Sequence, residues 1–99
     1  MPHWTFLTNH ALVLCFLAFN PQITGRELGN AIGITERAIR TIISDLCETG
    51  YIDKERVGRR VRYYVKLDLP VRGHTRQDVA VGELLHALGW NGTGTRASV

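Results

Sequence analysis

The chain has 99 residues and a mass of 11.1 kDa, which is enough for one domain of ordinary size. Hydrophobic residues make up 44% and charged residues 21%, a composition that excludes a disordered or fibrous chain. The net charge is only +3, but half of the twelve lysines and arginines lie between residues 54 and 66. These six are Lys54, Arg56, Arg59, Arg60, Arg62 and Lys66. Such a basic stripe in a nearly neutral domain indicates a polyanionic partner, either nucleic acid or an anionic membrane surface.

The cysteines and the apolar run near the N-terminus limit the class of protein further. Cys15 and Cys47 are too few for a disulfide scaffold and lack metal-ligand spacing, so we expect core residues in a reducing, cytoplasmic setting. The apolar run 11–19 is about half as long as a membrane span, and no Lys or Arg precedes it. The run therefore predicts a buried helix rather than a signal or transmembrane segment.

The first expected helix covers about 10–19, with Asn9 as its cap and Asn20-Pro21 as its end. A capping box, Thr24-Gly-Arg-Glu27, opens the second helix. This second helix stops at Gly33 and carries an apolar stripe formed by Leu28, Ala31 and Ile32.

A third helix of about 36–49 follows almost at once, with Thr35 as its cap and Gly50 after its end. Its core face, at helical spacing, consists of Ile39, Ile42, Ile43 and Leu46. The same spacing, rotated to the outside, gives a polar face of Arg37, Arg40, Thr41 and Ser44.

From 52 to 67 the apolar period changes to two, which predicts a half-buried hairpin. Gly58-Arg59 is typical of a two-residue turn, and this turn sets Ile52 opposite Val65 and Glu55 opposite Arg62.

A last helix is expected to start at the box Thr75-x-x-Asp78 and to end at Gly89. The domain would then cover 1–89, and residues 90–99, rich in small polar residues, would form a flexible tail.

Two segments carry a resemblance to a known family. They are Leu28-Gly29-x-x-Ile32-Gly33-Ile34-Thr35-x-x-Ala38-Ile39-Arg40 and Leu46-x-x-x-Gly50-Tyr51-Ile52, the second followed by the basic hairpin. Over about residues 4–88 the chain resembles winged helix-turn-helix transcriptional regulators of the MarR/ArsR-like family, as a short member without a sensor domain. It departs from them at Gly29, where a small Ala is more usual, and it lacks the paired thiols of ArsR-like metal sensors. The resemblance implies an α+β, mainly α fold, with a three-helix core, a β-hairpin wing and an additional C-terminal helix.

The resemblance and the charge pattern together predict a transcriptional regulator that binds double-stranded DNA. Of the two possible roles, repressor and activator, we expect the repressor. The helix 36–49 would enter the major groove, and the wing 52–67 would contact the adjacent backbone or minor groove. The expected DNA-binding residues are Thr35, Glu36, Arg37, Arg40, Thr41, Ser44, Arg56, Arg59, Arg60 and Arg62. Glu36 can instead stabilise the helix through its dipole, as an acid in the first turn, and Arg62 can instead pair with Glu55 across the hairpin.

No nucleophile elbow, phosphate loop or metalloprotease motif is present in the sequence, so we expect no enzyme, no cofactor and no metal site. The histidines show no obvious carboxylate partner. A homodimer is expected because the first and last helices carry more apolar surface than the core needs, at Leu12, Phe16, Phe19, Val81, Leu84, Leu85 and Leu88. The alternative is that both helices pack within the monomer. Alternative functions are a winged-helix protein interaction module and a domain that binds double-stranded RNA by shape.

Overall fold

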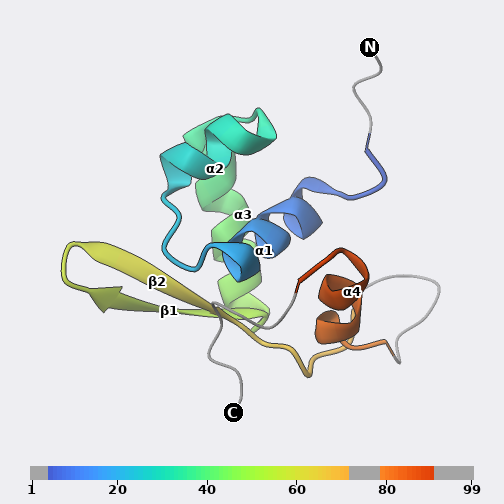
Figure 1. Cartoon of the computed structure of the whole chain (residues 1–99). Helices are drawn as coiled ribbons and strands as arrows, with labels where there is room; N and C mark the ends of the chain where they lie inside the picture. Colours follow the sequence, from blue (N-terminus) through green and yellow to red (C-terminus); the bar gives the residue numbers. More distant parts are fainter. Residues whose placement is uncertain (1–4, 72–78, 91–99) are drawn as a thin grey trace.

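Four helices and one antiparallel hairpin make up the computed structural model, which describes residues 5–71 and 79–90. In chain order the elements are α1 (Asn9–Phe19), α2 (Gly25–Ile32), α3 (Glu36–Glu48), β1 (Ile52–Val57), β2 (Arg60–Val65) and α4 (Val81–Ala87). α1 crosses in front of α3, α2 sits at one end of α3, and the hairpin projects sideways from the other end (Figure 1). This arrangement is the winged helix expected from the sequence.

Side-chain caps fix where the first two helices begin. The hydroxyl of Thr8 accepts a hydrogen bond from the Ala11 amide at 3.1 Å, so Thr8 is the cap of α1 and Asn9 is its first residue. The prediction of Asn9 as the cap was therefore wrong by one position. The capping box of α2 is confirmed, because the Glu27 amide donates to the Thr24 hydroxyl and the Thr24 amide donates to the Glu27 carboxylate.

A close turn joins α2 to α3. The amides of Gly33 and Ile34 both donate to the carbonyl of Gly29, at 2.7 and 3.1 Å, and Gly33 adopts the predicted left-handed conformation. A β-carbon on Gly29 would lie 2.7 Å from the carbonyl oxygen of Ile34, closer than side chains approach backbone oxygens. Gly29, where the sequence departs from the family pattern, is therefore a position at which this tight turn leaves no room for a side chain. Thr35 then caps α3 through the Ala38 amide, as predicted.

The core lies where α1, α3, the base of the hairpin and α4 meet, with Leu28 added from α2. The four apolar positions predicted on the inner face of α3 are all buried. The fully buried side chains are Leu17, Leu28, Ile39, Ile52, Leu85, Val13 and Val81. Ala31, predicted on the same apolar stripe as Leu28, is exposed instead. α2 is only two turns long and buries just its edge at Leu28 and Gly29, because that edge faces the turn into α3.

Both cysteines belong to the core or pack against it, as the sequence predicts. Cys15 is buried, and burial raises the pKa of its thiol, so the neutral form is favoured. Cys47 is half-buried and packs against the core. α1 buries Val13, Leu14, Cys15, Leu17 and Ala18, so its apolar surface is only partly covered within the chain. None of the helices in the described ranges is long and apolar enough to cross a membrane.

The hairpin has the predicted register, with Ile52 opposite Val65 and Glu55 opposite Arg62. Gly58 has φ 63°, which a two-residue turn of this kind requires at its first central position. The base of the hairpin is tied into the core, whereas the distal half is solvent-exposed on β1.

α4 begins later than predicted. Val79 lies in a bend, and Ala80 is extended and forms a β-bridge with Pro70. The Val71 amide also donates to the Val79 carbonyl, so neither residue is helical. The helix starts only at Val81, so the predicted start at the Thr75 box was wrong; that box itself lies outside the described residues.

The C-terminal part of the core also corrects two expectations. Val81 and Leu85, predicted to lie in a dimer interface, are 2% and 0% exposed within the single chain. Trp90, which we assigned to the tail, is buried at 5% exposure. Local amphipathicity marks such residues as buried, but it cannot tell whether the chain itself or a partner covers them. The rest of the predicted tail, residues 91–99, lies outside the described ranges.

Candidate nucleic-acid interface

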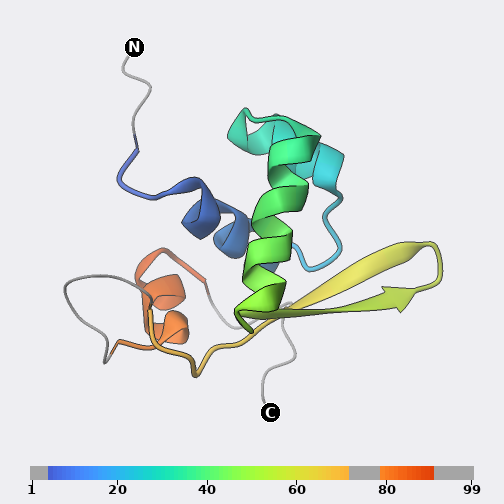
Figure 2. The same ribbon diagram turned by 180° about the vertical axis from the view of Figure 1, so that it is seen from behind.

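The outer face of α3 is polar, exposed and open to a large partner. The helix lies on the surface of the molecule, with the hairpin extending beside it (Figure 2). Arg37, Arg40, Thr41 and Ser44 are exposed there as predicted, and with Asp45 they line an open depression along the helix. One row of polar side chains is therefore available over about two turns of the helix.

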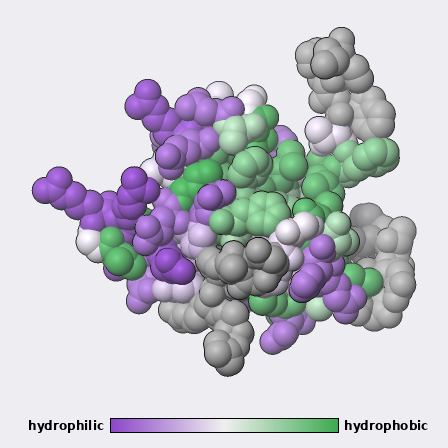
Figure 3. Space-filling model, in the orientation of Figure 1, coloured by the Kyte–Doolittle hydropathy of each residue, from purple (hydrophilic) through white to green (hydrophobic). Residues whose placement is uncertain are grey.

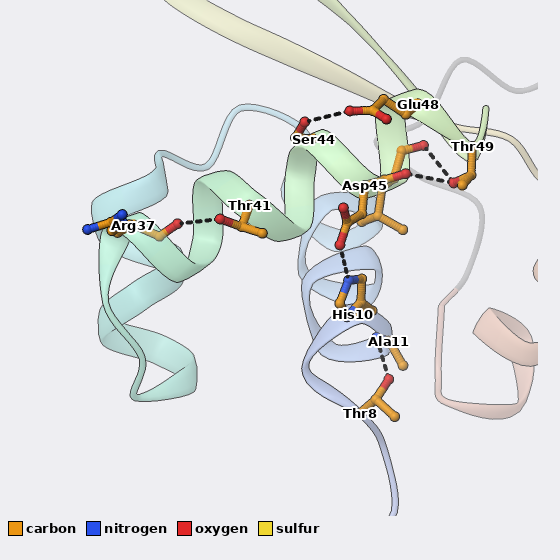
Figure 4. A network of polar contacts seen from close by, with 10 residues as sticks. Thr8, His10, Ala11, Arg37, Thr41, Ser44, Asp45, Glu48 and Thr49 are labelled. Carbon is orange, nitrogen blue, oxygen red and sulfur yellow. Dashed lines mark hydrogen bonds and ion pairs between the residues drawn. The ribbon is translucent and has the colours of Figure 1, made fainter.

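The contacts of this row leave its cations available. The Thr41 hydroxyl donates to the Arg37 carbonyl at 3.2 Å, and the Ser44 hydroxyl donates to the Glu48 carboxylate at 3.2 Å (Figure 4). Within the described part of the chain, no hydrogen bond or ion pair engages the guanidinium of Arg37 or Arg40. Both guanidiniums can therefore form a bidentate contact with an external acceptor.

The N-terminus of α3 adds two further donors and one acid. The Thr35 hydroxyl accepts from the Ala38 amide at 3.1 Å, so its own proton remains able to donate outward. The first amides of the helix have no helical carbonyl partner and favour an anion in front of them. Glu36 is exposed in the first turn, where its charge complements the helix dipole.

Some cations of the basic stripe have partners within the chain, and others do not have one among the described residues. Lys66 forms an ion pair with Asp53 at 2.8 Å, near the base of the hairpin. The guanidinium of Arg60 donates to the carbonyl of Gln22 at 3.2 Å, in the loop between α1 and α2. Arg56 and Arg59 are exposed and have no ion pair or hydrogen bond among the described residues.

Arg62 has a different environment. Its guanidinium lies over the ring of Tyr64, 5.6 Å from the ring centroid, and it is only half-exposed. The Tyr64 hydroxyl donates to the Glu55 carboxylate at 2.6 Å. The three side chains thus form a ladder across one face of the hairpin, which supports the interpretation that Arg62 is partly engaged within the wing.

Polar and apolar side chains are separated on the face of the molecule that carries α1. Figure 3 shows hydrophilic side chains gathered over the hairpin and over the end of the molecule that carries α2, while hydrophobic side chains gather over α1. The candidate interface consists of the open depression along α3 and the exposed cations of the wing.

One pair near this face was missed by the sequence analysis. His10 Nε2 lies 2.8 Å from Asp45 Oδ2, so the expectation that His10 lacks a carboxylate partner was wrong (Figure 4). The two residues are 35 positions apart and meet only because α1 packs across α3. No local spacing signals such a contact. Among the described residues, no group of three or more histidines, cysteines and acids is placed to hold a metal ion.

A helix-turn-helix whose second helix is polar outside, followed by a basic hairpin, defines a winged helix-turn-helix domain. Residues 9–53 match the model of a family described as winged helix-turn-helix DNA-binding. This match confirms the fold class expected from the sequence.

The chain is also similar to a solved structure of a transcriptional regulator. The chain is similar to the PcaV transcriptional regulator from Streptomyces coelicolor, whose crystal structure holds its natural ligand, with 27% identity and a TM-score of 0.52. The match covers 61% of this chain and 45% of that chain, so this chain spans less than half of the regulator's length. Together the two matches confirm the predicted resemblance to winged helix-turn-helix regulators of the MarR type. No curated protein is similar enough to the chain to count as a match.

Proposed function

We propose that the protein is a transcriptional regulator that binds double-stranded DNA with α3 in the major groove and the wing beside it. The single observation that carries this proposal is the exposed row on α3, with two guanidiniums that no described residue engages, next to a hairpin with two more. A major groove about 12 Å wide admits one helix. The family match and the regulator among the solved structures support the same function.

The residues divide into contacts that select a sequence and contacts that fix position. Arg37 and Arg40 would each donate two hydrogen bonds to guanine, worth about 1–3 kcal/mol of discrimination. Thr41 and Ser44 extend the same face toward neighbouring bases. Thr35 and the first amides of α3 would bind a phosphate, which fixes the register of the helix but carries no sequence information. Glu36 would accept from a cytosine amino group when the groove presents one.

The wing would supply electrostatic attraction and a second anchor. Arg56 and Arg59 are exposed and would reach phosphates or a narrow minor groove, with Arg62 behind them on β2. By occupying its DNA site in the cytoplasm the protein would exclude other proteins from it and so act as a repressor.

A homodimer would complete this function. Of the seven residues first expected in the interface, Leu12, Phe16 and Leu84 are half-buried, and Phe19 and Leu88 are 43% and 39% exposed. These five apolar side chains remain available to a twofold mate, which would place two α3 helices about 34 Å apart on a pseudo-palindromic site. Sedimentation at roughly tens of micromolar should show a dimer, and a monomer there would contradict this part of the proposal.

A fluorescence-polarisation titration with a labelled random duplex, repeated across salt concentrations, tests DNA binding. We expect binding at low salt and a linear fall of log K with log salt, with a slope of about −0.9 for each phosphate neutralised. Arg59→Ala should reduce that slope by about 0.9.

Lys66→Ala is the matched control, because it removes one charge from the same hairpin but from a lysine already paired with Asp53. Its slope should stay close to that of the unmodified chain. Absence of duplex binding at low salt would refute the proposed function, and equal binding to duplex RNA would favour the alternative of recognition by shape.

A further inference from the structure

The hairpin is anchored to the body of the domain along only part of its length. A two-stranded hairpin is marginally stable by itself, so its direction depends on what it contacts. The base is secured by Ile52 and Val65, which are core residues. Farther out, the Tyr63 amide donates to the Pro21 carbonyl at 2.8 Å, and the Arg60 guanidinium donates to the Gln22 carbonyl at 3.2 Å.

Both outer contacts reach the same short loop between α1 and α2. Arg60 and Tyr63 are three residues apart on β2, a distance of about 10 Å along the strand. The contact of Arg60 therefore extends the anchored part of the hairpin almost to its turn at Gly58-Arg59. Because the acceptors are two successive backbone carbonyls, the loop presents a fixed edge to the strand.

The surroundings of Arg60 strengthen this attachment. Arg60 lines one groove together with Phe19, Gln22 and Glu27, so the guanidinium has an acid in the same groove. The pKa of Glu27 is lowered mainly by hydrogen bonds from Thr24 and to a smaller degree by the charge of Arg60. The cation is thus set among partners of its own chain.

The neighbouring Arg59 lies in the turn itself, and it is exposed without a partner among the described residues. We propose that Arg60 is a positioning residue that fastens the wing to the α1–α2 loop, and that it thereby aims Arg59 at the DNA. This inference rests on the DNA-binding function proposed above. From the sequence, both arginines are expected to contact DNA. In this proposal Arg59 contacts the nucleic acid, and Arg60 acts only by positioning Arg59.

A double-mutant cycle on the full chain separates this role from two independent contacts. Arg59→Ala, Arg60→Ala and the double variant are titrated against one duplex across salt. We expect each single variant to lose about 0.9 in the magnitude of the salt slope, and the double variant to lose no more than either. A loss of about 1.8 in the double variant would show two independent phosphate contacts and overturn the proposal. An unchanged slope for Arg60→Ala would overturn it as well.

A measurement without DNA tests the attachment itself. Hydrogen exchange of the Tyr63 amide, which donates to Pro21, should be faster in Arg60→Ala by roughly two- to tenfold, the range expected for weakening one hydrogen bond. Arg59→Ala is the matched control and should leave this rate unchanged. An unchanged rate in Arg60→Ala would overturn the proposal even if the protein binds DNA. Faster exchange together with no duplex binding would instead locate the failure in the proposed function.

Discussion

Substitution of Gly29 by alanine tests how the helix-turn-helix is built. In an exposed helix an alanine is about 1 kcal/mol more stable than a glycine. At this position, however, the new β-carbon would lie 2.7 Å from the Ile34 carbonyl oxygen. The turn cannot simply withdraw, because the amides of Gly33 and Ile34 both donate to the Gly29 carbonyl. Overpacking of this kind costs about 1–3 kcal/mol, so we expect a net loss of up to about 2 kcal/mol.

Gly25→Ala provides the matched control in the same helix. A β-carbon there would meet only the Ile39 side chain at 3.8 Å, an ordinary contact. That variant should be unchanged or more stable by up to about 1 kcal/mol. Thermal unfolding followed by circular dichroism measures both, since 1 kcal/mol shifts Tm by roughly 4–8 °C in a domain of this size. If Gly29→Ala raised Tm as much as Gly25→Ala, the turn would have room for a side chain and the argument for Gly29 would be wrong.

Three further outcomes are expected. Ile39→Ala should lower the free energy of unfolding by about 2–5 kcal/mol in a denaturant titration, because Ile39 is fully buried in the core; a loss below about 1 kcal/mol would contradict that placement. Glu27→Gln should be less stable than the unmodified chain at neutral pH. The folded-state pKa of Glu27 is lowered below its ordinary value near 4.5, chiefly by the Thr24 backbone hydrogen bond, so its stabilising effect is present above that value and lost as pH falls through the folded pKa. Thermal unfolding against pH should therefore show the two proteins converging in acid, and a constant difference would count against the ionised capping box. Arg37→Ala and Arg40→Ala should flatten the preference among selected duplexes more than they weaken binding to random DNA; a uniform loss across sequences would assign them to phosphates.

Elements governed by neighbouring residues were predictable from the sequence. The capping box at Thr24 and Glu27 and the cap at Thr35 depend on residues three apart, and both are present. The inner face of α3 follows from helical spacing, and the register of the hairpin follows from its two-residue turn. These features determine which residues of α3 face outward and where the basic residues of the wing lie. Most of the candidate interface could therefore be predicted from residues close together in the sequence.

The contacts that were missed depend on residues far apart in the chain. His10 meets Asp45 across 35 positions, and the Arg60 side chain reaches Gln22 across 38. The same holds for the start of α4, where the bridge between Pro70 and Ala80 keeps Ala80 extended just before the helix. Such pairings are set by how helices and strands pack together, which no periodicity in one segment specifies.

The central claim is that DNA lies against α3 and the wing together. Amide chemical shifts of the isotope-labelled chain, recorded during titration with a duplex of about two helical turns, test it most directly. The account predicts that the largest shifts fall at residues 35–44 and 56–62. No shifts at low salt, or shifts confined to α1 and α4 on the other side of the core, would contradict it.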